Sequence, residues 1–301
     1  MPELPDIEAY VSALQARVLH TPLQGVRLAS PFLLRTAVPP LKDTFGLKVQ
    51  AISRLGKRIV LSLENDLHLV IHLMIAGRLQ WKDTPEAPIP GGKRGLAAFD
   101  FAPGTLLFTE AGTKKRASLH VVVGRDGLGE HDPGGLEVLE TDLAAFSERL
   151  RLRNHTLKRA LTDPRLFSGI GNAYSDEILH HAGLSPVRMS QAMSDEEVAR
   201  LHASIKTVLQ QWTDRFLAEA KDAWPAKVTA FRPEMAAHGK YGKPCPVCGT
   251  DIQRIRHAAN ETNYCPRCQT GGKMLADRSL SRLLKKDWPK TIEELELARK
   301  G

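Results

Sequence analysis

The chain has 301 residues, of which 42% are hydrophobic and 25% are charged. It is long enough for two domains with real cores, and its composition is ordinary for a soluble globular protein. No apolar run approaches the length of a membrane span, and the acidic Glu3, Asp6 and Glu8 do not fit the basic start of a signal peptide. We therefore expect a cytoplasmic protein that binds no membrane.

The positive charge is confined to one part of the chain. The formal net charge is +8, from 42 basic and 34 acidic residues. Residues 227–286 hold 12 basic and 4 acidic side chains, so this segment accounts for the whole excess. A local basic surface is typical of a protein that binds a phosphate backbone, but a solvated charged face has the same composition. Charge alone leaves both interpretations open.

The first residues predict an amphipathic helix over 4–19 with a reactive group at its start. Its apolar stripe consists of Leu4, Ile7, Val11, Leu14 and Val18. If Met1 is removed, Pro2 presents a secondary amine, which titrates well below a lysine and can form an iminium with an electrophilic carbon. Glu3 is a neighbouring candidate for a general acid or base. Met-Pro is also a common start, and Pro often opens a helix.

Short β-type runs follow, with turn signals between them. They are Lys48–Ser53, Arg58–Leu63, Leu67–Ile75, Ala97–Phe101, Thr105–Thr109 and Leu119–Val123. This spacing predicts an all-β sandwich or a flattened barrel. Residues 84–95 are rich in Pro and Gly and predict a loop, and the five Gly of residues 124–135 predict a linker.

The second half of the chain has helical periodicity. The predicted helices are Asp142–Arg151, Thr156–Leu161, Asn172–Ala182 and Asp195–Ala220. Gly169 and Gly171 precede Asn172, so exposed N–H groups at this helix start favour an anion. A turn with a capping Asn explains the same residues equally well.

Four cysteines form the strongest single motif. Two Cys-x-x-Cys pairs are separated by sixteen residues: Cys245, Cys248, Cys265 and Cys268. This spacing predicts one tetrahedral structural zinc ion, because the protein supplies all four ligands and leaves no position for a catalytic water. A redox pair or an iron–sulfur site is the alternative.

In combination, these elements resemble the formamidopyrimidine-DNA glycosylase / endonuclease VIII family of bifunctional base-excision repair enzymes. The resemblance spans residues 2–269 and rests on motifs that occur in the family's order. They are Pro2-Glu3-Leu4-Pro5, Gly56-Lys57, His72-Leu73, Gly169-Ile170-Gly171-Asn172 and the four-cysteine finger.

The resemblance implies an α+β multidomain fold. It comprises an N-terminal helix plus β-sandwich over residues 1–130 and a helical domain with a helix–two-turn–helix motif over 131–230. A four-cysteine zinc finger over 231–270 and a basic extension over 271–301 complete the chain. Residues 277–288 predict a short helix in this extension. Its Leu280, Leu283, Leu284 and Trp288 favour packing against the finger over binding DNA.

The same resemblance implies a monomeric DNA glycosylase with AP-lyase activity. Its partner would be double-stranded DNA with an oxidised or ring-opened base or an abasic site. Pro2 would attack C1′, Glu3 would be its acid/base partner, and Lys57 would contact a nearby phosphate. β,δ-Elimination of the abasic strand would follow. Further expected DNA contacts are Asn172, Lys158 and His72.

The chain departs from the family pattern at several places. Asn260 stands where the family usually has an arginine in the finger hairpin, so Arg256 or Arg254 would have to take its role. The stretch Gly112-Thr113-Lys114-Lys115-Arg116 lacks the family's aromatic wedge, which makes Lys114, Lys115 and Arg116 the candidate DNA contacts there. Ile75, or Met74 before it, takes the void-filling position, and Asp6 stands where the family often has Glu.

Two other functions remain to be weighed. A non-cleaving protein that binds damaged or unusual DNA on the same fold would suit the altered loop and hairpin, but it would not need Pro2, Glu3 and Lys57. A zinc-ribbon factor of transcription or translation would explain the cysteines but not the N-terminus.

Overall fold

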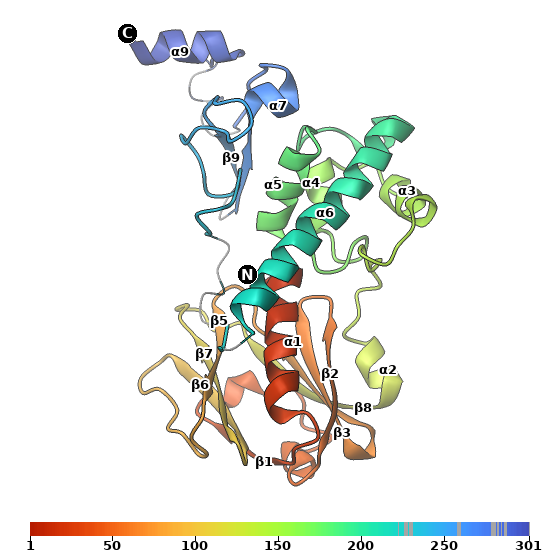
Figure 1. Ribbon diagram of the computed structural model, residues 1–301, viewed down its shortest axis with the longest axis vertical. Coiled ribbons are helices and arrows are strands. Elements are labelled where there is room, and N and C mark those ends of the chain that lie inside the picture. Colours follow the sequence, from red (N-terminus) through yellow and green to blue (C-terminus); the bar gives the residue numbers. More distant parts are fainter. Residues whose placement is uncertain are drawn as a thin grey trace. The chain divides into compact units, whose positions relative to one another are not determined.

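The computed structural model describes residues 1–221, 223–225, 228, 231–257, 260–277, 281, 283, 285 and 288–300. The chain divides into two compact units (Figure 1). The first comprises Met1–Gly134 and Gln211–Thr229, and the second comprises Gly135–Gln210 and Ala230–Gly301. The predicted α+β class, with an N-terminal helix and sheets, a helical region and a four-cysteine finger, is confirmed. The boundaries of the four predicted domains stay predictions.

Two antiparallel four-stranded sheets form the first unit. The first sheet has the order β1-β6-β7-β5, with β1 Leu23–Leu28, β5 Gly77–Lys82, β6 Gly95–Phe101 and β7 Gly104–Glu110. The second sheet has the order β2-β3-β4-β8, with β2 Val49–Leu55, β3 Arg58–Leu63, β4 Leu67–His72 and β8 Ser118–Val123. Helix α1 (Leu4–Val18), red in Figure 1, shares one apolar core with both sheets.

Local chemistry explains where α1 begins. Pro5 lies in the first turn, where its missing N–H costs nothing. The Asp6 carboxylate accepts the backbone N–H of Glu3 at 2.9 Å, which is one half of a capping box. The apolar stripe predicted for this helix is buried against the sheets.

Strands β1 and β5 are two elements that the sequence analysis missed. It extended one strand over Leu67–Ile75, whereas β4 ends at His72 and a turn reverses the chain into β5. In this turn Met74 has a φ of +52°, and the Gly77 N–H donates to the Leu73 carbonyl at 2.9 Å. A Cβ on Gly77 would lie 2.2 Å from that carbonyl oxygen, so only glycine fits.

Short segments complete the first unit. Helix α2 (Gly124–Gly129) lies where a linker was predicted, and the 3-10 segments are η1 Pro31–Leu33, η2 Leu41–Thr44 and η3 Glu64–Asp66. The predicted glycine-rich loop is confirmed, since residues 83–94 contain no helix or strand.

The predicted helices of the second half are confirmed within two residues at each end. They are α3 Leu143–Arg151, α4 Leu157–Thr162, α5 Asn172–His181 and α6 Asp195–Glu219, with η4 Ser190–Ala192 between the last two. The finger consists of β9 (Gln253–His257), β10 (Asn260–Tyr264) and α7 (Pro266–Thr270), and α9 (Ile292–Lys300) follows. No helix among the described residues is long and apolar enough to span a bilayer.

The C-terminal extension pairs with itself through its backbone, and its Leu275 N–H donates to the Tyr264 hydroxyl of the finger at 2.8 Å. Met274 donates to the Lys290 carbonyl at 2.8 Å, and Ile292 donates to the Gly272 carbonyl at 3.1 Å. The predicted helix 277–288 lies partly outside the described residues, as do Leu280 and Leu284. Leu283 is 77% exposed, so the expectation that it needs burial is wrong. The buried apolar contacts come instead from Met274 and Ile292.

Candidate active site and DNA-binding elements

The first turn of α1 brings Pro2, Glu3 and Asp6 together in a buried position. Glu3 and Asp6 are only 2% and 3% exposed. One Asp6 oxygen accepts the Glu3 N–H, and the other, Oδ1, has no hydrogen-bond partner among the described residues. Burial raises the pKa of Asp6 to about 7, although the Glu3 N–H opposes the shift. Asp6 therefore exchanges its proton near neutral pH.

Residues of the same group also shift the pKa of the N-terminal amine. Burial lowers the pKa of this amine, Glu3 opposes the shift, and Arg78 and Lys57 add to it. The amine here belongs to Met1, so the Pro2 nitrogen is an amide that stands in for the secondary amine freed by processing. We call Pro2, Glu3, Asp6 and Lys57 the N-terminal site. Arg78, on β5, is a neighbour that the sequence analysis missed.

A tight hairpin turn supplies Lys57. Leu55 and Arg58 pair across the turn, and Gly56 has a φ of +61°, as the first turn residue of a type II′ hairpin requires. Lys57 is half-buried, and burial lowers its pKa while Glu3 raises it. The structure thus brings Lys57 within electrostatic reach of Glu3 and the amine. The catalytic roles of Pro2, Glu3 and Lys57 stay predictions.

The end of β4 and the turn that follows it carry three of the predicted DNA contacts, His72, Met74 and Ile75. His72 pairs with Arg58 on one side and Ser118 on the other. Burial and the nearby Arg58 lower the pKa of His72 to about 4, so the ring is neutral at physiological pH. Met74 is half-buried at the turn, whereas Ile75 is 60% exposed. Of the two, Ile75 is the more accessible to a ligand.

The loop with Lys114, Lys115 and Arg116 is held at its base by Glu110. The buried Glu110 carboxylate accepts the backbone N–H of Arg116 at 3.1 Å and that of Ala117 at 3.3 Å. The Lys115 ammonium donates to the Glu110 carbonyl. Lys114 and Arg116 are exposed. Glu110 therefore fixes the base of the loop, and the exposed side chains of Lys114 and Arg116 are accessible to a ligand.

In the second unit, Asn172 begins α5 and contacts the finger. Its Nδ2 donates to the Glu261 carbonyl of β10 at 3.0 Å. Lys158 donates to the Asn172 carbonyl and to Asp176 Oδ1, both at 2.6 Å. The Lys158 side chain is 13% exposed and the Asp176 side chain 0%. Lys158 is thus an internal brace for Asn172 in this structure, and its predicted DNA contact stays a prediction.

The finger hairpin contains both arginines named as substitutes for the family arginine. Arg254 lies 4.0 Å from the Tyr241 ring centroid and 3.2 Å from Glu261 Oε2. Arg256 lies 3.7 Å from the same oxygen. Asn260 is exposed at the start of β10. Glu261 therefore partly neutralises both arginines beside Asn260.

A buried polar network joins α5 to the segment before the finger. Glu177 accepts the backbone N–H groups of residues 236, 237 and 238 at 2.8 Å each. His238 Nδ1 lies 2.8 Å from Asp176 Oδ2, and Asn263 Oδ1 accepts the Gly239 N–H at 2.7 Å. The sequence analysis missed this network. Its signal in the sequence is the adjacent acids Asp176 and Glu177, which lie on a mostly buried helix.

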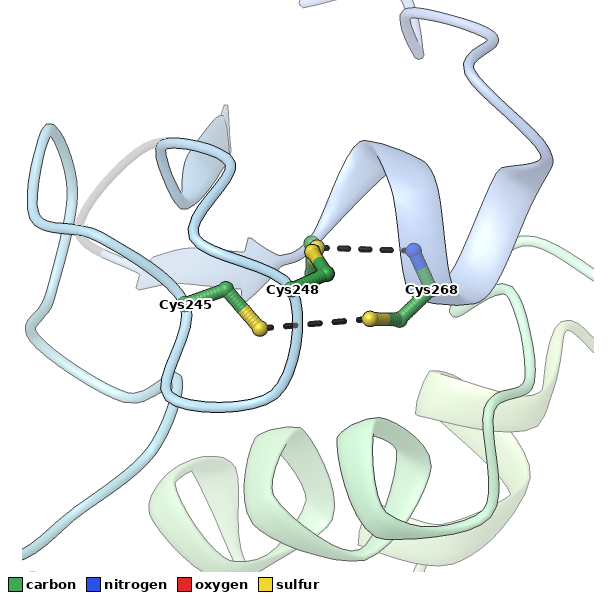
Figure 2. A group of neighbouring side chains, drawn as sticks. Cys245, Cys248 and Cys268 are labelled. Atoms are coloured by element: carbon green, nitrogen blue, oxygen red, sulfur yellow. Dashed lines mark hydrogen bonds between the residues drawn. The ribbon is translucent and has the colours of Figure 1, made fainter.

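The four cysteines converge on one point, as predicted. Their Sγ atoms all lie within 4.8 Å of one another. The Cys245–Cys268 and Cys248–Cys265 sulfur distances are 3.9 and 3.4 Å, against about 3.8 Å for an edge of a zinc–thiolate tetrahedron. Figure 2 shows the loop of Cys245 and Cys248 facing Cys268 on the short helix. Four thiolates at this spacing fit one structural zinc ion, and no other ligand type is needed.

His180 supports this metal centre from α5. Its Nε2 lies 3.1 Å from Cys245 Sγ, and both residues are buried. A partner of this kind orients a metal ligand. The helix that carries Asn172 thus also contacts the zinc site, so α5 and the finger form one local body.

Three family models match the chain in this order. Residues 1–113 match the formamidopyrimidine-DNA glycosylase N-terminal domain, and residues 135–215 match its H2TH domain. Residues 242–271 match a zinc finger found in FPG and IleRS. These modules define a zinc-containing DNA-repair class with a helix–two-turn–helix domain.

One relative matches nearly the whole chain, and another matches about half of it. A formamidopyrimidine-DNA glycosylase of Heliobacterium modesticaldum is 33% identical over 89% of this chain and 100% of its own length. A formamidopyrimidine-DNA glycosylase-like protein of Mycobacterium tuberculosis is 39% identical over 51% of this chain and 93% of its own length. The chain belongs to the formamidopyrimidine-DNA glycosylase family.

Solved structures of similar fold are complexes with DNA. Lactococcus lactis Fpg bound to DNA with N7-benzyl-Fapy-dG has a TM-score of 0.79 at 26% identity, over 89% of this chain and 100% of that chain. The same enzyme bound to abasic-site DNA has a TM-score of 0.77 at 26% identity, over 89% and 99%. The predicted family, enzyme class and zinc ion are thereby confirmed.

Proposed function

We propose that this chain excises oxidised or ring-opened bases from double-stranded DNA and then cuts the abasic strand. One observation carries the proposal: Pro2, Glu3 and Asp6 are buried together at the start of α1, with Lys57 within electrostatic reach of Glu3. A nucleophilic amine, a proton-transfer group and a phosphate-binding cation are what this chemistry requires. Removal of Met1 is the necessary first step, because only then is Pro2 an amine.

The proposed reaction begins with the damaged nucleotide turned out of the duplex, since C1′ is otherwise inaccessible. The Pro2 nitrogen forms a bond to C1′ as the bond to the base breaks, and the departing base takes up a proton. Glu3 serves as the acid and base for proton transfer at the sugar. The Pro2 nitrogen then loses its proton, and the C1′–O4′ bond breaks as O4′ takes up a proton, which opens the sugar ring. The resulting iminium carries its positive charge on the Pro2 nitrogen.

The iminium then makes strand cleavage possible. It acidifies the C2′ proton, so removal of that proton expels the 3′ phosphate by β-elimination. A second proton loss expels the 5′ phosphate by δ-elimination and leaves a one-nucleotide gap. Lys57 holds a phosphate near the lesion. The zinc ion, when bound, supplies only folding energy for the finger.

The predicted DNA contacts form three groups under this proposal. Asn172 and His72 would bind backbone phosphate, with Lys158 holding Asn172 in place. Ile75, Met74 and the loop of Lys114, Lys115 and Arg116 would fill the space left by the flipped nucleotide. Arg256 and Asn260 would bind phosphate from the finger hairpin, where Asn260 brings a hydrogen-bond donor but no charge.

We further propose that the protein acts as a monomer on DNA in the bacterial cytoplasm. Its relatives named above come from bacteria. The basic segment 227–286 would hold it near the nucleoid through non-specific phosphate contacts.

A second candidate is a DNA-binding protein of the same fold that does not cleave. The observation that favours it is the finger hairpin, where Asn260 brings no charge and Glu261 partly neutralises both Arg254 and Arg256. A weaker grip on the phosphates that flank the lesion would suit a protein that binds DNA without positioning it for cleavage.

The deciding experiment traps the iminium. The purified protein is first weighed as an intact chain to establish that Met1 is absent, then mixed with abasic-site duplex DNA and sodium borohydride. We expect a covalent adduct that peptide mapping places on Pro2. Absence of an adduct in a processed protein that binds the duplex tightly would refute the enzymatic proposal and favour the second candidate.

A further inference from the structure

The outer face of the second sheet has a group of basic side chains that the proposed reaction does not use. Strands β3, β4 and β8 run side by side, and their register places Arg58, His72 and Ser118 in one row. The next row on the same face is Val60, Val70 and His120. We call Arg58, His72, His120 and His131 the outer-face cluster.

A small apolar patch borders the cluster on the same face of the sheet. It consists of Val60, Val70 and Val122, and Leu128 of α2 packs on it. His131, just after α2, lies against His120 with ring centroids 4.4 Å apart and ring planes tilted by 59°. Helix α2 therefore covers the apolar part of the face and brings a second imidazole beside His120.

Cationic neighbours act on each histidine of the cluster, including Arg58 on His131. Arg58 and Lys57 act on His72, and His131, Arg58 and Arg35 act on His120. Two carboxylates oppose them: Asp132 acts on Arg58, and Glu130 acts on His131. Ser118 is the neutral partner of His120, with its Oγ 3.3 Å from Nε2.

The cluster combines one guanidinium with imidazoles that are held in their neutral form. Burial and cationic neighbours lower the pKa of both His72 and His120 to about 4, and burial lowers the pKa of Arg58. The four members are half-buried, and the Arg58 guanidinium is the charged member that an anion would meet. A bound phosphate would accept hydrogen bonds from the imidazoles and favour their protonated form.

The position of the cluster indicates which anion it binds. Arg58 follows Lys57 directly, so the cluster continues from the N-terminal site across neighbouring strands. Two strand spacings separate β3 from β8, about 10 Å, which is roughly the rise of three nucleotides. We propose that Arg58, His120 and His131 bind the phosphate backbone of the DNA that flanks the lesion. This inference rests on the proposed function, because it takes Lys57 as a contact near the lesion.

The test measures binding to a duplex with a non-cleavable abasic-site analogue, at several salt concentrations. Arg58→Gln is expected to weaken binding about threefold to tenfold and to lower the salt slope by about one. Lys42→Gln, an exposed lysine on η2, removes the same charge elsewhere and is the matched control. Arg58→Lys should restore most of the salt slope, which separates a charge effect from a folding defect.

The histidines are tested by pH. Because phosphate binding raises the pKa of His120 from about 4, wild-type affinity should increase as pH falls from about 7 to about 5. The double variant His120→Gln/His131→Gln should lose most of this increase, whereas His72 remains to give a residual effect. Inorganic phosphate at moderate concentration should compete only weakly, because the site fits a continuous backbone.

The outcomes are distinguishable from those of the trapping experiment. If Arg58→Gln and the double histidine variant bind like the Lys42→Gln control, the inference is wrong, even if Pro2 forms the adduct. If they lose affinity as expected while no adduct forms, the inference about DNA binding stands and the proposed reaction fails.

Discussion

The N-terminal site and the zinc finger differ in how far apart their residues lie in the sequence and in how their charges are paired. The finger takes its four ligands from 24 consecutive residues, 245–268, and its two arginines pair with Glu261 in the same hairpin. The N-terminal site combines residues 2–6 with Lys57 from a distant turn, and burial lowers the pKa values of both its amine and Lys57. In the finger hairpin one carboxylate faces two arginines, whereas at the N-terminal site the amine lies near Lys57 and Arg78 as well as Glu3.

This contrast has a physical reason. A phosphate-binding surface must be stable in the free protein. A neighbouring carboxylate, which DNA can displace, reduces the repulsion between its cationic side chains until DNA binds. A nucleophilic amine must instead be unprotonated, so a carboxylate alone beside it would raise its pKa and inactivate it. The cationic Arg78 and Lys57 and the burial of the amine counteract the effect of Glu3 at the N-terminal site.

The largest effect should come from the zinc ligands. Cys265→Ser is expected to abolish stoichiometric zinc and unfold the finger, because a structural zinc contributes most of the folding energy of such a small unit. The N-terminal unit should keep its fold. Zinc content, circular dichroism and DNA affinity measure this, with Val247→Ala as control, since Val247 is 76% exposed between two ligands. Retained zinc and DNA binding in Cys265→Ser would contradict a four-ligand site.

The second effect concerns chemistry without binding. Glu3→Gln should slow cleavage of abasic-site DNA by about a hundredfold or more, since a general acid and base typically contributes this much. Affinity for a non-cleavable duplex should change little, because Glu3 is only 2% exposed. Single-turnover rates and binding curves provide the two readouts. If affinity and rate fall together, Glu3 has a structural role and not a catalytic one. The proposed difference between the N-terminal site and the finger would then be wrong.

The third effect is a pH dependence of stability. The Asp6 pKa is raised to about 7, so the folded state holds a proton that the unfolded state releases near pH 4. Stability is therefore greatest below the unfolded pKa and is lost as pH rises through 7, by about 2 kcal/mol between pH 5 and 8. Asp6→Asn should flatten this part of the profile. Urea unfolding at several pH values checks the sign, and an unchanged profile in the variant would refute it.

The smallest effect tests the balanced charge in the finger. Glu261→Gln should free Arg254 and Arg256 for phosphate and increase DNA affinity about threefold, with a steeper salt dependence. Glu148→Gln, an exposed acid on α3, makes the same change in net charge and is the control. Weaker binding by Glu261→Gln would mean that the carboxylate orders the hairpin and does not compete with DNA.

The elements with local signals were predictable from the sequence. The zinc site was, because two Cys-x-x-Cys pairs and their spacer suffice to define a tetrahedron. The long helix α6 was also predictable, because its apolar stripe is regular over many turns. Strands β1 and β5 were missed for the converse reason: β1 has no regular alternation of buried and exposed residues, and β5 follows β4 after a turn that periodicity does not reveal.

The sequence by itself determined the candidate catalytic and metal-binding residue types, their order along the chain and the family to which they belong. Only the tertiary structure decided which side chains they contact. It gave Lys158 an internal partner in Asp176, paired Arg254 and Arg256 with Glu261, and set His120 beside His131. Ion pairs and pKa values respond to distances in space between side chains, which spacing along the sequence does not contain.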